Sequence, residues 1–249
     1  MLIPATDKAS NAGATPQPGE QMASEIQDET GKVLYRALYD LKEAPVPAGK
    51  AGTGLKAAFV SETWPDAAFK AALDAPPPQP AADADTVIKA IRLGWDILKD
   101  GRAVTDLKGA STAILNARNM NPMDYYEAKP GQSAHYYWWG YNWPVKSWKA
   151  FEVWVRVNGT YGAKAPADVP PGLYLPDIHV EFPHAPWAQW GLTMNGSAQI
   201  TTTSNVGKKE SDIAYCQVLV TVTVSSIVDP SRPQPFKFTA RGDNGFRLG

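Results

Sequence analysis

The sequence predicts a mainly β protein: an antiparallel β-sandwich of about seven or eight strands, immunoglobulin-like or jelly-roll-like, preceded by an N-terminal arm with one or two short helices. Apolar and polar residues alternate in residues 151–158, 177–182 and 217–224. Such alternation is typical of strands with one face on a core and the other toward water. The chain has no regular succession of strands and helices, which argues against an α/β enzyme.

Turn-forming residues lie between the expected strands. The Asn-Gly pairs at 158–159 and 195–196 are typical of two-residue hairpin turns. The Arg-Gly-Asp tripeptide at 241–243 resembles an adhesion motif, but the Asn-Gly that follows it favours a tight turn. These signals divide the second half of the chain into short strands.

Charge and proline content divide the chain into two expected domains. Residues 1–86 carry a net charge of −5 and 10 of the 22 prolines, whereas residues 87–249 carry a net charge of +4. The stretch Ala-Pro-Pro-Pro-Gln-Pro-Ala-Ala at 75–82 favours an extended linker. We therefore expect an acidic, Ala/Pro-rich arm over residues 1–86 and a β-sandwich domain over residues 87–249.

The arm is expected to contain two helices. Apolar residues in 20–43 fall roughly on one helical face, and two prolines follow that segment. A shorter helix is expected over residues 63–73, with Thr63 as its N-cap and with Phe69 and Leu73 four residues apart. We expect both helices to pack on the sandwich.

Composition excludes several classes of protein. The 249 residues include 44% hydrophobic residues, a net charge of −1 and a single cysteine. These values argue against a disordered chain, a dedicated nucleic-acid binder, an internal disulfide and a cysteine-based metal cluster. No apolar run is long enough to cross a membrane. Residues 1–19 lack the apolar core of a secretory signal, which predicts a cytoplasmic protein or one exported without a leader.

Aromatic residues form a dense belt in the second half of the chain. Sixteen of the 26 aromatic residues lie between Tyr125 and Trp190, most densely in 136–148. Neighbouring strand residues point to opposite faces, so one set of these rings fills a core and the other set faces outward. The candidate residues for binding a ligand or partner are Tyr137, Trp138, Trp139, Tyr141, Trp143, Trp148, Trp187 and Trp190.

Three interpretations of the aromatic belt remain open from the sequence. The rings pack internally, form an interface with a protein partner or a second copy, or provide a platform for a carbohydrate. Binding of nucleic acid is not expected, because Lys146 in the dense part of the belt and Lys149 directly after it are the only Lys or Arg residues there.

The histidines suggest a metal site as a further hypothesis. His179 and Glu181 lie two residues apart on one expected strand and therefore face the same side. A third ligand would come from His184 or from His135. No cofactor is otherwise expected, and a divalent metal belongs to this hypothesis alone.

The sequence favours a non-enzymatic protein, because it contains none of the common nucleophile, zinc-protease, phosphate-loop or dinucleotide motifs. The leading hypothesis is a recognition or assembly protein in which the aromatic face and the arm bind a partner chain or a second copy. The alternatives are a lectin-like or small-ligand binder, a metal-assisted hydrolase using His179 and Glu181, and a membrane-interacting, toxin-like protein.

Overall fold

The computed structural model describes twelve segments of the chain: residues 17–44, 54–75, 92–95, 110–115, 121–144, 146, 149–169, 171–184, 186–188, 192–208, 210–226 and 234–249. Within these segments the protein is mainly β, with fifteen strands in two sheets, one α-helix and one 3₁₀ helix. None of the helices in these segments is long and apolar enough to span a membrane.

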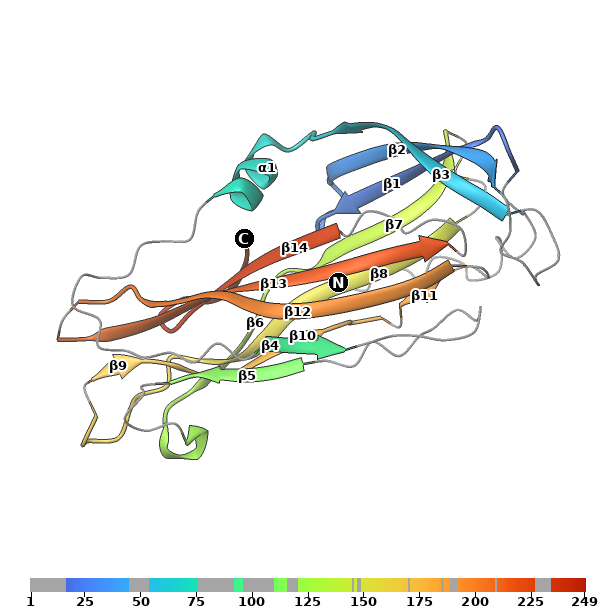
Figure 1. Ribbon diagram of the computed structural model, residues 1–249. Helices are drawn as coiled ribbons and strands as arrows, with labels where there is room; N and C mark the ends of the chain where they lie inside the picture. Colours follow the sequence, from blue (N-terminus) through green and yellow to red (C-terminus); the bar gives the residue numbers. More distant parts are fainter. Residues whose placement is uncertain are drawn as a thin grey trace.

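Nine strands form the larger sheet (Figure 1). Its main path runs β3 (Gly54–Thr63), β2 (Val33–Ala44), β1 (Gln21–Gln27), β7 (Tyr136–Trp143), β8 (Lys149–Tyr161), β10 (Leu175–Glu181) and β5 (Ala110–Ile114), and β6 (Lys129–Gln132) and β11 (Trp187–Ala188) also pair with β8. Every pair in this sheet is antiparallel.

Six strands form the smaller sheet. Its path runs β15 (Gly245–Leu248), β14 (Gln234–Arg241), β13 (Asp212–Ser226), β12 (Leu192–Asn205) and β4 (Arg92–Trp95), and β9 (Gly172–Leu173) pairs with β13. Only the short β9–β13 pair is parallel among the described strands. The expected mainly β, antiparallel character of the chain is therefore confirmed.

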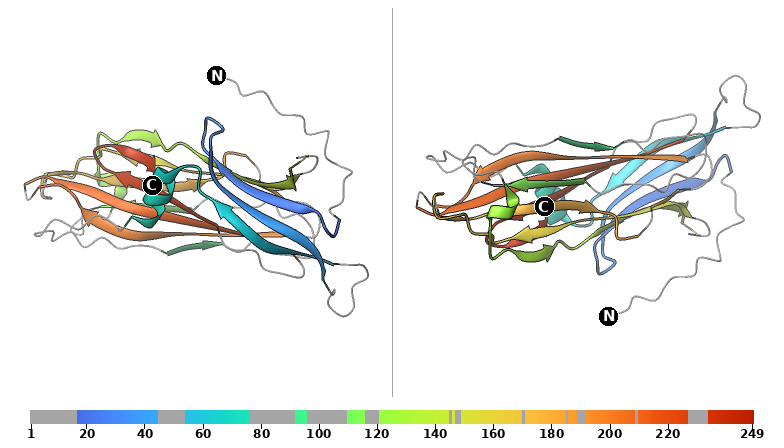
Figure 2. Two further views of the ribbon diagram at one scale, coloured as in Figure 1. Left: turned by 90° about the horizontal axis from the view of Figure 1, so that it is seen from above. Right: turned by 90° about the horizontal axis from the view of Figure 1, so that it is seen from below.

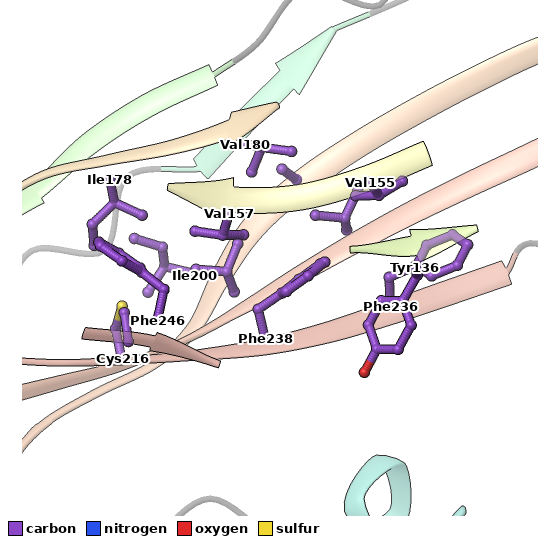
Figure 3. Packing of buried hydrophobic residues seen from close by; sticks show 14 of the residues in the cluster. Tyr136, Val155, Val157, Ile178, Val180, Ile200, Cys216, Phe236, Phe238 and Phe246 are labelled. Atoms are coloured by element: carbon purple, nitrogen blue, oxygen red, sulfur yellow. The ribbon is translucent and has the colours of Figure 1, made fainter. Parts of the chain in front are cut away.

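One apolar core joins the two sheets in a sandwich-like arrangement (Figures 1 and 2). The ring of Tyr136, on β7 of the larger sheet, lies 5.7 Å from that of Phe236 and 5.3 Å from that of Phe238, both on β14 (Figure 3). Cys216 on β13 is fully buried in this core, and burial raises the pKa of its thiol to about 12. Cys216 is therefore an unreactive packing residue.

The prediction of a helix over residues 20–43 is wrong, because this segment forms the hairpin of β1 and β2. The Asp28 carboxylate accepts hydrogen bonds from the backbone N–H groups of Thr30 and Lys32 and so closes the turn. Gly31 supplies the positive φ of 82° that the turn requires. The apolar spacing that resembled a helix instead places alternate β2 residues, such as Ala37 and Leu41, in the core.

The pairing of β1 with β7 is continuous. Gln21 to Gln27 pair with Trp143 to Tyr137, so residues from the expected arm lie inside the larger sheet. The proposed linker beyond residue 75 and the domain boundary at residue 86 fall outside the described residues, and the two-domain division stays a prediction.

The outermost described strand beside this hairpin is β3, which contains a β-bulge. Leu38 pairs with Ser61 and Tyr39 pairs with Phe59, so Val60 has no opposite residue on β2. The Val60 side chain is 47% exposed at this edge of the sheet.

The one α-helix in the described segments lies where the second helix was expected. Helix α1 (Ala67–Asp74) begins after Asp66, whose side chain accepts a hydrogen bond of 2.9 Å from the backbone N–H of Phe69. Its C-terminal end is held by Lys237 of β14, which is only 9% exposed. The Lys237 ammonium donates to the carbonyl oxygens of Ala72 and Ala75 at 3.0 and 2.8 Å. A cation at this position also suits the helix dipole.

Both Asn-Gly pairs expected in turns lie inside long strands, 158–159 in β8 and 195–196 in β12. Gly159 has φ +150°, and a Cβ atom there would come within 2.1 Å of the carbonyl oxygen of Asp177 on β10. The glycine thus permits close approach of two strands instead of a turn. The tripeptide at 241–243 does lie at the β14–β15 turn, where Arg241 and Asp243 form a bidentate ion pair at 2.9 Å.

Lys237→Met is expected to lower the free energy of unfolding by about 1–3 kcal/mol, because it leaves two backbone carbonyls at the C-terminal end of α1 without their charged donor. Urea unfolding measures the loss, and hydrogen exchange should show faster exchange in α1. Lys42→Met, at an exposed position of β2, is the matched control and should change stability by less than about 0.5 kcal/mol. Equal effects of the two substitutions would contradict the proposed role of Lys237.

Candidate functional site

The candidate site lies on the outer face of the larger sheet, the face turned away from β14. Four rings form a line across β8 and β7, which we call the aromatic row: Trp154, Tyr137, Trp139 and Tyr141. Successive ring centroids lie 4.1, 5.9 and 4.3 Å apart, with interplanar angles of 25°, 19° and 33°. The first two pairs are therefore stacked, and the Trp139–Tyr141 pair is tilted.

Stacking determines which part of each ring is available to a ligand. The stacked pairs Trp154–Tyr137 and Tyr137–Trp139 turn part of their π faces toward one another, and lysine ammonium groups lie over the rings of Trp139 and Tyr141. Carbohydrate platforms depend on open ring faces, whereas methionine sulfur and polar groups make favourable contacts at ring edges. The row is better suited to protein side chains than to a sugar ring.

Two lysines lie against the end of the row that is formed by Trp139 and Tyr141. The Lys146 ammonium is 4.7 Å from the centroid of Tyr141 and 5.3 Å from that of Trp139, and the Lys149 ammonium is 5.6 Å from that of Trp139. Lys146 is exposed and has a φ of +56°, which is uncommon for a residue with a side chain. The strained backbone holds a cation above the rings.

The carboxylate of Glu152 connects Lys149 to the row. Its Oε2 accepts hydrogen bonds from the Lys149 ammonium at 2.6 Å and from the Tyr137 hydroxyl at 3.1 Å. Burial, together with the Glu152 charge, raises the pKa of Tyr137. The Tyr137 hydroxyl is therefore protonated at neutral pH and acts as a donor.

A fully buried carboxylate, that of Glu25 on β1, lies at the end of the row. Its Oε1 accepts hydrogen bonds from the Tyr141 hydroxyl at 2.7 Å and from Arg36 Nε of β2 at 2.6 Å. Burial alone would raise the pKa of Glu25, but the hydrogen bonds from Tyr141 and Arg36 and the charges of Arg36 and Lys146 hold it below its ordinary value. This network joins β1, β2 and β7.

Two histidines flank the other end of the row. The rings of His135 and His184 lie 4.7 and 5.1 Å from that of Trp154, both in edge-to-face geometry. Burial lowers the pKa of His135. Its Nε2 atom is buried without a hydrogen-bond partner, as is Nε1 of Trp139. The row and the adjacent His135 thus each contain a buried polar atom whose hydrogen-bonding capacity is unused.

The hypothetical metal ligands are engaged elsewhere. His179 pairs with Asp177 at 2.5 Å, and Glu181 accepts hydrogen bonds from Arg156 and Asn158. His135 and His184 lie together at Trp154. No group of three or more His, Cys, Asp or Glu residues in the described segments has the geometry to hold a metal ion.

The structure divides the expected binding residues between two faces. Trp138 lies in the core, where its Nε1 donates to Ser24 Oγ at 2.7 Å and its ring contacts Phe151 at 4.6 Å. Tyr137, Trp139 and Tyr141 lie on the outer face, as the alternation predicts. Trp148 and Trp190 fall outside the described residues. The backbone of Trp143 pairs with that of Gln21, and the backbone of Trp187 pairs with that of Glu152. The side chains of Trp143 and Trp187 are not among those that the structure describes.

Sequence reasoning missed two central members of the site. Trp154 occupies an outward position in the alternation of 151–158, and the same rule that placed Tyr137 outward would have found it. Glu25 had no such signal, because its burial depends on Tyr141, 116 residues away in the chain.

Comparison with protein-family models, with curated proteins and with solved structures yields no match for this chain.

Glu25→Gln is expected to lower the free energy of unfolding by about 2–3 kcal/mol at neutral pH, because Arg36 and Tyr141 lose a charged acceptor. The pKa of Glu25 is lowered in the folded state from its ordinary value of 4.5. The ionised Glu25 carboxylate therefore contributes its full stabilisation of the folded state above pH 4.5. This contribution is lost as the pH falls through the folded-state pKa of Glu25. Denaturant unfolding from pH 7 to pH 3 should show the variant and the native protein converging.

Glu43→Gln, at an exposed position of β2, is the matched control and should leave the native stability profile nearly unchanged. A constant difference between Glu25→Gln and the native protein across this pH range would contradict the assigned ionisation of Glu25.

Proposed function

We propose that this chain is a non-enzymatic recognition or assembly protein, which uses the outer face of its larger sheet and its N-terminal strands to bind a partner chain or a second copy of itself. The observation that carries the proposal is the aromatic row. A sheet face directed toward solvent is normally polar. Here it carries three half-buried rings, those of Tyr137, Trp139 and Trp154, beside the fully buried Tyr141, and lysines border them.

The chemistry of this face matches that of protein interfaces. Tryptophan, tyrosine and arginine are enriched in the cores of interfaces, where a few large rings supply most of the binding energy. Self-association is the form of the proposal that the isolated chain tests directly.

The alternatives receive less support from the described residues. A carbohydrate platform would use open ring faces, which stack on neighbouring rings in the row. A metal-assisted hydrolase would require His179 and Glu181 to leave their present partners, Asp177 and Arg156. A membrane-interacting role has no specific observation in its favour.

Self-association predicts that the average mass of the native protein rises with concentration in light scattering or sedimentation. Trp154→Gln removes one ring from the row and should weaken association by about tenfold or more. His179→Gln changes an exposed residue of β10 on the same face and should leave association unchanged.

Circular dichroism and urea unfolding would establish that both variants are folded before their masses are compared. A protein that remains monomeric at every concentration contradicts self-association. A Trp154→Gln variant that is folded and associates like the native chain contradicts the assignment of the interface to the aromatic row.

A further inference from the structure

A second apolar surface lies near the C-terminal end of β8, in the loop that contains the 3₁₀ helix η1 (Pro122–Asp124). We call residues 121–127 the η1 tip. Met123 is 87% exposed and Tyr126 is 49% exposed, and these are two of the four large apolar residues exposed in the described segments. Between them, Asp124 is also exposed. The η1 tip therefore presents an apolar surface with a negative charge.

The η1 tip is held firmly despite its exposure. Asn121 caps η1 by accepting a hydrogen bond from the backbone N–H of Met123 at 3.2 Å. Tyr126 exchanges two backbone hydrogen bonds with Lys164, at 3.2 and 2.9 Å, and the side chains of Lys164 and Glu127 form an ion pair. Tyr125 is buried against Tyr174 with ring centroids 5.3 Å apart. A preorganised loop loses little conformational entropy on binding.

The η1 tip and the aromatic row are complementary in chemistry. Tyr137, Trp139 and Trp154 of the row are half-buried, and aromatic rings make favourable contacts with a methionine sulfur. The exposed Lys146 ammonium offers a positive charge to the Asp124 carboxylate.

The two surfaces cannot meet within one molecule. Tyr126 pairs with Lys164, just beyond the end of β8 at Tyr161, whereas the row crosses β8 at Trp154. Seven residues of extended strand separate these positions by about 23 Å. The lysine end of the row is farther still, since Phe151 pairs with Gly140. Figure 1 shows the loop preceding β6 near β5 and β9, away from the end of β7 that lies beside β1.

We propose that the η1 tip of one molecule binds the aromatic row of a second copy, with Met123 against the half-buried rings and Asp124 against Lys146. This contact is heterologous, because it joins two different surfaces of the same chain. The inference rests on the proposed self-association and specifies which surfaces meet.

A complementation experiment tests this pairing. Met123→Glu disables the η1 tip, and Trp154→Gln disables the row, so each variant alone should associate about tenfold or more weakly than the native chain. An equimolar mixture retains one intact tip and one intact row. Sedimentation of the mixture should therefore show a species of two chains, at concentrations where each variant alone is monomeric.

A charge exchange supplies an independent arm. Asp124→Lys and Lys146→Asp should each weaken association, and the double variant should recover much of it, because the opposite charges face each other again. Lys208→Glu, in an exposed loop of the smaller sheet, is the control and should associate like the native protein.

The outcomes separate this inference from the proposed function. A native chain that is monomeric at every concentration overturns both. A native chain that associates while Met123→Glu associates equally well, or a mixture that shows no two-chain species, overturns the tip–row contact alone and leaves self-association in place.

Discussion

The register of β7 between β1 and β8 is the constraint on which the rest of the structure depends. Even-numbered residues of β7, Tyr136 and Trp138, face the core and contact β14. Odd-numbered residues, Tyr137 and Trp139, face outward in the aromatic row. A slip of one residue in either ladder would exchange the two sets. One backbone register therefore defines the core and the candidate binding surface together.

The N-terminal hairpin fixes this register through buried polar contacts. Successive residues of β1 serve opposite faces of the sheet: Ser24 accepts the indole hydrogen bond of Trp138 inside, and Glu25 accepts the phenolic hydrogen bond of Tyr141 outside. In any other register these buried groups would lose their partners, at a cost of several kcal/mol. The β1–β2 hairpin, which was expected to belong to a separate arm, is therefore part of the larger sheet. The negative charge of its buried Glu25 is neutralised by Arg36.

Sequence patterns predicted structure well where burial on one face follows from local alternation. In β8, Val153, Val155 and Val157 are all buried, as their spacing predicts. The patterns failed where a distant strand decides the outcome. Residues 20–43 have apolar spacing compatible with a helix, but their partner β7 lies more than 90 residues away in the chain. Likewise, the role of Gly159 depends on the close approach of β10 and not on its own neighbours.

The bulge in β3 has a consequence for how copies of this protein could accumulate. An uninterrupted edge strand is a template onto which further chains add by backbone hydrogen bonding, and such growth leads to cross-β fibrils. The extra residue at Val60 interrupts the regular ladder spacing at this exposed edge. Backbone templating is therefore disfavoured there, and folded molecules are left to associate through side chains, in contacts that dilution reverses.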